Sequence, residues 1–90
     1  MAKVRIPTPL LGFTRNQREV SVPGATVGEV LFNLGQSYPG IGPRLLDSNG
    51  AVLRYVTVFY KDEDVRFLQQ LNTPVTEEDS LTILAAMAGG

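Results

Sequence analysis

The last residues of the chain carry a group that can do chemistry without any side chain. The sequence ends in Ala88-Gly89-Gly90. An α-carboxyl group titrates near about 3.5, so a free carboxylate on Gly90 is ionised at neutral pH and can attack the α-phosphate of ATP when an enzyme holds both. Sulfide, a persulfide or a thiolate can then attack the acyl-adenylate, which leaves a thiocarboxylate or a thioester on Gly90.

The small residues before Gly90 suit that chemistry. They bury little area and glycine is costly to order, so we expect residues 85–90 to form a flexible tail. A tail of this kind can enter a narrow channel where a Cβ atom would clash. Ala88, Gly89 and Gly90 are therefore predicted to thread into the active site of a partner. The alternative is a frayed chain end without a function.

Side-chain catalysis has little to work with in this sequence. The 90 residues include no cysteine and no histidine, which excludes thiolate nucleophiles, disulfides, the usual zinc clusters and the commonest proton shuttle at neutral pH. The adjacent carboxylates of Asp62, Glu63 and Asp64 diverge in a tight turn and lack the spacing of a calcium loop. We expect a protein that is not an enzyme and binds no metal or cofactor itself, and whose activating partner uses ATP.

Length and composition are those of one small globular domain. The hydrophobic fraction of 43% is ordinary for such a domain, and the formal net charge is −1. No apolar run approaches the roughly 18 residues of a membrane span, and Lys3 and Arg5 are not followed by the apolar core of a secretion signal. Neither sign of charge forms the dense patch of a nucleic-acid binder. We expect a cytoplasmic protein that binds neither nucleic acid nor membranes.

Two short strands and one helix are predicted in the first half of the chain. Val4 and Ile6 alternate with basic residues, and Val20 and Val22 alternate with polar ones, which is typical of half-buried strands paired as a hairpin. A capping-box signature and apolar residues at helical spacing then predict an amphipathic helix that Pro39-Gly40 ends. The residues that carry this helix are Thr26, Val27, Glu29, Val30, Leu31, Leu34 and Tyr38.

The second half of the chain favours three more strands. Residues 52–60 are rich in β-branched and aromatic side chains, residues 61–64 form a charged turn, and a short strand is predicted at residues 65–67. Leu81 and Ile83 alternate with polar residues in a last strand. One helix can cover only one face of such a sheet. We therefore predict an α+β domain over residues 1–84, with a mixed sheet and one main helix packed across one face.

Alternation along the strands also predicts which side chains the sheet exposes. If the apolar residues of the last strand face the helix, Leu84 faces solvent, and by the same rule Phe59 faces away from the helix. Phe59 and Leu84 are predicted to share an exposed apolar patch near the tail and, with Met87, to contact a partner protein. The alternative is that residues 10–13 cover Phe59 and complete a minor core.

Acidic residues precede the last strand. Glu77, Glu78 and Asp79 can steer a basic partner toward the tail, because charge complementarity raises association rates. The alternative is a solvated turn.

The ordered combination of these motifs resembles the ThiS/MoaD family of prokaryotic sulfur carriers, and within it the CysO-like carriers. The resemblance covers essentially the whole chain and rests on residues 56–60 (VTVFY), 62–67 (DEDVRF) and 79–84 (DSLTIL) and on the ending Ala88-Gly89-Gly90. It implies a ubiquitin-like β-grasp fold. It also implies that a ubiquitin-activating-type enzyme adenylates Gly90 and converts it to a thiocarboxylate, whose sulfur passes to a biosynthetic acceptor.

The resemblance also implies a set of partners. For CysO-like carriers these are a pyridoxal-phosphate-dependent synthase of cysteine biosynthesis and a metalloprotease that releases cysteine from the carrier. Other members of the family supply sulfur for thiamin, molybdopterin, thiolated tRNA or natural products. Two alternatives stay open: a ubiquitin-like modifier joined through Gly90 to lysine amines, and an interaction module whose Gly-Gly ending has no role.

Overall fold

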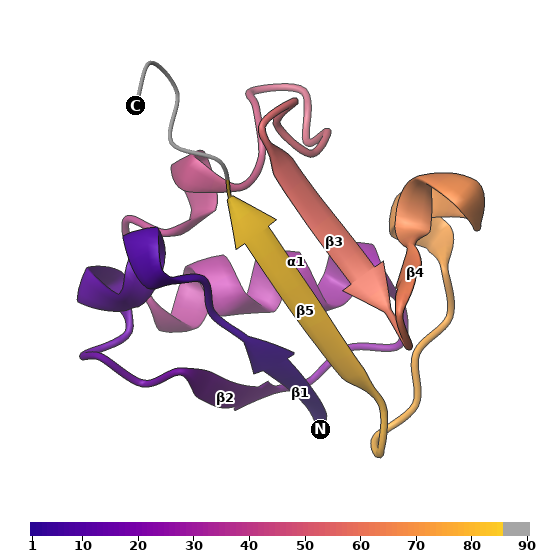
Figure 1. Ribbon diagram of the computed structural model, residues 1–90, viewed down its shortest axis with the longest axis horizontal. Helices are drawn as coiled ribbons and strands as arrows, with labels where there is room; N and C mark the ends of the chain where they lie inside the picture. Colours follow the sequence, from indigo (N-terminus) through magenta and orange to yellow (C-terminus); the bar gives the residue numbers. More distant parts are fainter. Residues whose placement is uncertain (86–90) are drawn as a thin grey trace.

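The computed structural model describes residues 1–85 as a mixed sheet with a helix across one face (Figure 1). The strands lie in the order β2-β1-β5-β3-β4. β1 and β5 run parallel, and the other neighbours are antiparallel. The predicted fold class is therefore confirmed. The elements are β1 (Ala2–Arg5), the 3-10 turn η1 (Thr8–Phe13), β2 (Glu19–Val22), α1 (Val27–Ser37), the turn η2 (Gly42–Arg44), β3 (Val56–Tyr60), β4 (Glu63–Asp64), the turns η3 (Val65–Phe67) and η4 (Gln70–Asn72), and β5 (Ser80–Ala85).

The core lies between the sheet and α1. Alternate residues of each strand point toward the helix, and α1 turns its apolar stripe toward the sheet, as the two sequence periods predict. Each fully buried aliphatic side chain contributes about 1.5–3 kcal/mol, so packing holds α1 in place despite its two internal glycines. Among the most deeply buried side chains are Val4, Val22, Val27, Val30, Leu31, Leu34, Ile41, Leu45, Val58, Leu81 and Ile83.

The helix begins where the capping box predicts. The Thr26 side chain accepts a hydrogen bond from the backbone N–H of Glu29, at 3.2 Å. The Glu29 carboxylate accepts one from the N–H of Ala25, at 3.0 Å, which is one residue earlier than in the usual box. Gly28 is explained by a close approach, because a Cβ atom there would lie 3.1 Å from the carbonyl oxygen of Leu71. This glycine lets the loop before β5 pack against α1.

Two strand boundaries differ from the prediction. The strand predicted over residues 52–60 begins only at Val56, because the chain turns at residues 54–55 and the Val56 N–H bonds to the Leu53 carbonyl at 3.0 Å. The strand predicted at residues 65–67 is the 3-10 turn η3, and β4 comprises Glu63–Asp64. The Asp64 carboxylate caps η3 by accepting from the Arg66 N–H at 2.9 Å, so the chain leaves the sheet there.

The last strand extends slightly past the predicted end of the domain. β5 includes Ala85, one residue beyond the boundary predicted at residue 84. The rest of the predicted tail, residues 86–90, lies outside the described residues. Figure 1 shows that β5 occupies the middle of the sheet, between β1 and β3. Its last residue, Ala85, is followed in the sequence by the residues that lead to Gly90.

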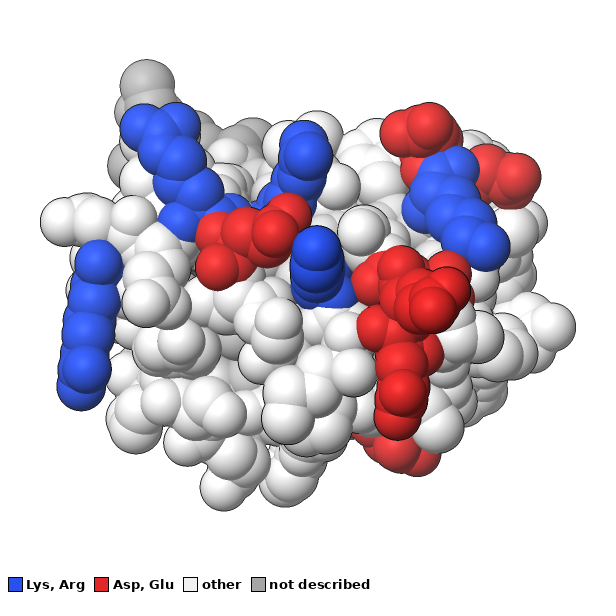
Figure 2. Space-filling model, turned by 90° about the horizontal axis from the view of Figure 1, so that it is seen from below, with Lys and Arg blue, Asp and Glu red and all other residues white. Residues whose placement is uncertain are grey.

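Charge is distributed unevenly over the surface. Figure 2 shows acidic side chains gathered toward the side where β4 and the loop before β5 lie, and basic side chains mainly toward the other side. Within residues 1–85, no helix is both long enough and apolar enough to cross a bilayer.

Candidate functional site

The face of the sheet away from α1 holds the side chains predicted to contact a partner. In the β3–β5 ladder Thr57 lies opposite Leu84 and Phe59 lies opposite Thr82. Phe59 and Leu84 are therefore diagonal neighbours on one face, a relation that places Cα atoms about 7–8 Å apart. Leu84 is 50% exposed. The structure thus brings both predicted residues to the same outer surface, with two threonines at the other corners.

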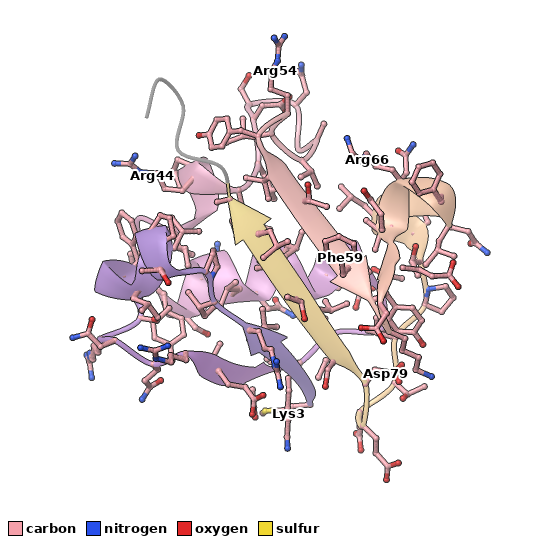
Figure 3. The ribbon with its side chains drawn as sticks, viewed as in Figure 1. Lys3, Arg44, Arg54, Phe59, Arg66 and Asp79 are labelled. Atoms are coloured by element: carbon pink, nitrogen blue, oxygen red, sulfur yellow. The ribbon has the colours of Figure 1, made fainter. Side chains whose placement is uncertain are left out.

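Phe59 is half-buried on this face (Figure 3). The residues of the alternative, 10–13, have partners of their own in the turn η1. Leu10 is buried in the core, and the Phe13 ring lies beneath the Arg44 guanidinium, 5.5 Å from its centroid. Phe59 instead has Asp64 of β4 as its cross-strand neighbour.

A groove continues the outer face beside Leu84. Its volume is about 520 Å³, and it lies between the end of β5 and the segment that follows β1. The parallel pairing of Arg5 with Thr82 places that segment there. Sequence reasoning missed the lining residues that follow β1, since no local pattern predicts which strands pair in parallel. The groove is lined by Arg5, Ile6, Pro7, Thr8, Pro9, Tyr55, Thr57, Thr82, Ile83, Leu84 and Ala85.

The opposite end of β5 is fixed by a buried carboxylate. Asp79, only 6% exposed, accepts hydrogen bonds at 2.8 Å from the Tyr60 hydroxyl and from the Thr76 N–H. Its other oxygen lies 3.3 Å from Nζ of Lys61. The Asp79 carbonyl accepts from the Lys3 N–H at 3.0 Å. Asp79 thus joins the starts of β1 and β5 to the end of β3, and Figure 3 shows it at the foot of β5.

These contacts set the electrostatics of the Asp79 end. The backbone N–H of Thr76, together with the Tyr60 hydroxyl and Lys61, lowers the pKa of Asp79 to about 2. Asp79 correspondingly raises the pKa of Lys61. Asp79 is buried and its negative charge is balanced by Lys61, so it cannot steer a distant partner. It also lies at the far end of β5 from Leu84, about 17 Å away at the usual rise of a strand. Asp79 therefore has a structural role, while Glu77 and Glu78 are exposed and steering by them stays a prediction.

The carboxylates predicted not to bind metal are used within the fold. Asp64 accepts hydrogen bonds from Nε and Nη2 of Arg66, the shorter at 2.8 Å, and these lower its pKa. Asp62 occupies the hairpin turn with a positive φ of 70°. Among residues 1–85 no group of three or more acidic side chains is placed to hold a metal ion. The predicted contacts of Met87, Ala88, Gly89 and Gly90 lie outside the described residues.

The arrangement can bind another protein, and within residues 1–85 it brings together no nucleophile and base. An exposed apolar face continues into a groove at the end of the strand that leads toward Gly90. Neighbouring threonine hydroxyls and the Arg5 side chain give this surface a polar rim. The face is suited to docking another protein.

Known proteins with related sequences are small carriers and modifiers. The Mycobacterium tuberculosis "Sulfur carrier protein CysO" is 46% identical over 89 residues, which covers 97% of this chain and 96% of that protein. The Haloferax volcanii "Small archaeal modifier protein 3" is 33% identical over 66 residues, which covers 73% of this chain and 71% of that protein.

Solved structures agree with the sequence comparison. The crystal structure of M. tuberculosis CysO matches with a TM-score of 0.89 and 43% identity, over 97% of this chain and all of that one. A chain of the Amycolatopsis orientalis BexX/CysO complex matches with a TM-score of 0.90 and 39% identity, over the full length of both chains.

The family profile gives the same result. The ThiS family matches residues 4–90, which include the second half of β1, the strands β2 to β5, the helix and the Gly-Gly ending. The CysO relatives are named as sulfur carrier proteins, so the similarity is to proteins that serve enzymes and are not enzymes themselves. The chain belongs to the ThiS family.

Proposed function

We propose that this chain carries sulfur as a thiocarboxylate on Gly90. The observation that carries the proposal is the match to a sulfur carrier over 97% of the chain, on a fold that exposes Leu84 at the end of the strand leading to Gly-Gly. The absence of cysteine and histidine from the sequence supports a protein that is acted upon.

The proposed chemistry takes place on the Gly90 carboxylate, in the active site of a ubiquitin-activating-type enzyme. A carboxylate oxygen attacks the α-phosphorus of ATP and pyrophosphate leaves, which gives the acyl-adenylate. A sulfur nucleophile at the oxidation level of sulfide then attacks the acyl carbon. AMP leaves and takes with it the carboxylate oxygen that had attacked the α-phosphorus. The product is the thiocarboxylate. ATP is bound by the partner enzyme and not by this chain.

The outer face is the proposed docking surface for that enzyme. Leu84 and the groove beside it provide apolar contact area, with Phe59 one diagonal step away. A central apolar anchor within a polar rim is the usual form of a protein interface. Docking there fixes the origin of residues 86–90, so that Ala88, Gly89 and Gly90 extend into the partner's site. Met87 would contact the entrance to that site.

Cysteine biosynthesis is the proposed destination of the sulfur. The support is the 46% identity to CysO, against 33% to the archaeal modifier. In this proposal the acceptor partner is a pyridoxal-phosphate-dependent synthase, and a metalloprotease releases the product from the carrier. Thiamin, molybdopterin, tRNA thiolation and natural-product sulfur are the other destinations that a carrier of this chemistry can serve.

A second candidate function is protein modification. It is favoured by the similarity to a protein named as a small archaeal modifier. Activation is common to both functions, and they differ in whether sulfide or a lysine amine attacks the acyl carbon.

The test is the intact mass of the protein after incubation with a candidate activating enzyme, ATP and sulfide. We expect a mass increase equal to the difference between sulfur and oxygen, located on Gly90 by fragmentation. A variant that lacks Gly90 is the control and should show no change. Unmodified protein with every activating enzyme of the host, or conjugates to lysine in place of thiocarboxylate, would contradict sulfur carriage.

A further inference from the structure

Part of the sheet edge at β3 is open. β4 pairs only with Phe59 and Tyr60, while β5 pairs with the whole of β3. Within residues 1–85, Val56, Thr57 and Val58 therefore have a strand on one side only. Successive residues of a strand direct their N–H and C=O groups to opposite sides. Val58 therefore directs its N–H and C=O to the same side as Tyr60, which pairs with Glu63 of β4, and this is the open side. An edge of this kind can accept another strand.

A groove lies along this open edge. It has a volume of about 220 Å³ and is bounded at one end by residues 51–54 and at the other by Val65 and Arg66 of η3. Leu53, Leu71 and Val65 give it an apolar lining. The volume is below the roughly 300 Å³ at which drug-sized ligand pockets begin. It suits one or two apolar side chains of an extended peptide.

Two guanidinium groups line the groove. Figure 3 shows Arg54 above the start of β3 and Arg66 beside η3. Arg66 uses Nε and Nη2 to hold Asp64. Among the described residues Nη1 of Arg66 and the whole Arg54 guanidinium have no hydrogen-bond partner. With Asp64 as the one acidic side chain of the lining, the lining residues carry two positive charges and one negative charge, a local excess of one positive charge on the side of the molecule where other acidic side chains gather.

We infer that the open edge of β3 binds an extended, acidic segment of a partner protein by strand addition. Since the Val56 N–H is bonded to the Leu53 carbonyl, the main-chain hydrogen bonds of the added strand centre on the N–H and C=O of Val58. An apolar side chain of the segment enters the groove, and a carboxylate of the segment bonds to Arg54 or Arg66. This edge borders the outer face, with Thr57 lining both grooves, but its groove includes neither Leu84 nor Phe59. The inference goes beyond the proposed sulfur chemistry and does not depend on it, because binding at β3 makes no use of Gly90.

The probe is a synthetic peptide, acetyl-Ser-Asp-Val-Ile-Val-Glu-Ser-amide, titrated into the ¹⁵N-labelled full chain. We expect amide shift changes concentrated at residues 54–58 and 64–66. Arg54→Glu should weaken binding at least about fivefold, since an attraction becomes a repulsion. Arg18→Glu, which makes the same change of charge outside the groove, should leave the affinity within about twofold. Circular dichroism establishes that both variants fold.

Two further peptides separate strand addition from simple charge attraction. A peptide N-methylated at alternate residues cannot form the main-chain ladder, and we expect it to bind at least about tenfold more weakly. A version with lysine in place of both acidic residues should also lose binding. Equal binding of the lysine peptide, shifts centred on Leu84, or no shift at saturating concentrations would overturn the inference. In the last case the arginines only protect the edge against association.

Discussion

The two ends of β5 have opposite surroundings. At its start, Asp79 is buried and joined to three other segments by hydrogen bonds and an ion pair. Toward its other end, Leu84 is half-exposed on an open apolar surface. One strand thus combines a fixed start with an end that is free to contact another molecule. The comparison suggests that stability and partner recognition are separable in this protein, and substitutions at each end test that separation.

The largest effect is expected at the exposed end. Leu84→Arg should lower kcat/KM for adenylation of the chain by about 100-fold, because it places a charge at the centre of the proposed interface. The free energy of unfolding should change by no more than about 0.5 kcal/mol, since the side chain is already half in water. Steady-state kinetics of pyrophosphate release and urea titration measure the two quantities.

Phe32→Arg is the matched control for that substitution. Phe32 is 60% exposed on α1, on the other side of the sheet from Leu84. The Phe32→Arg substitution should leave both kcat/KM for adenylation and the free energy of unfolding nearly unchanged. An equal loss of activation in the two variants would mean that charge, and not the position of Leu84, determines the effect.

The second prediction concerns the fixed end and acid. The pKa of Asp79 is about 2 in the folded chain, against 3.8 ordinarily. The unfolded state therefore binds more protons between these values, and Asp79 contributes stability above about pH 4 that is lost as the pH falls toward 2. The contribution is roughly 2 kcal/mol. Urea titrations from pH 7 to 2 should show this loss, and Asp79→Asn should be less stable at pH 7 and lack this part of the slope.

Tyr60→Phe should give a smaller loss. It removes the hydroxyl that donates to Asp79 at 2.8 Å and keeps the ring. A hydrogen bond to a charged group contributes about 1.5 kcal/mol, so the free energy of unfolding should fall by about that amount while adenylation kinetics stay unchanged. Impaired adenylation in a folded Tyr60→Phe protein would show that the two ends of β5 are coupled.

The smallest effect is expected at Lys61. Its ammonium group lies 3.3 Å from Asp79, but the side chain is 65% exposed. Exposed ion pairs contribute little, so Lys61→Met should cost no more than about 0.5 kcal/mol in urea titrations at physiological salt. A loss as large as that of Tyr60→Phe would mean that the pair is shielded from solvent.

Sequence periodicity predicted the fold and the faces of its strands. The alternation in residues 81–84 placed Leu84 outside, and helical spacing placed Leu31 and Leu34 inside, because both patterns follow from backbone geometry alone. The strand predicted at residues 65–67 was wrong, since the Asp64 side chain competes with the ladder. Its β-branched and aromatic residues gave no sign of this.

The sequence could not predict those features of the site that depend on contacts between residues far apart in the chain. The groove beside Leu84 depends on the parallel register of β1 and β5, and the buried state of Asp79 depends on Tyr60, which lies 19 residues away in the chain. The acidic run that contains Asp79 resembles any solvated turn. Only the tertiary structure distinguishes its buried member from the exposed Glu77 and Glu78.

The central position of β5 also bears on how the protein is made. β1 and β3 do not pair with each other, and both pair with β5. The sheet therefore cannot close until residues 80–85 have left the ribosome, and closure requires contacts between distant parts of the chain, which form slowly. A nascent chain that stops before β5 lacks both the folded sheet and the Gly-Gly ending. Under the proposed function, folding and the capacity for activation thus arise together when the last strand is translated, and incomplete chains do not compete for the activating enzyme.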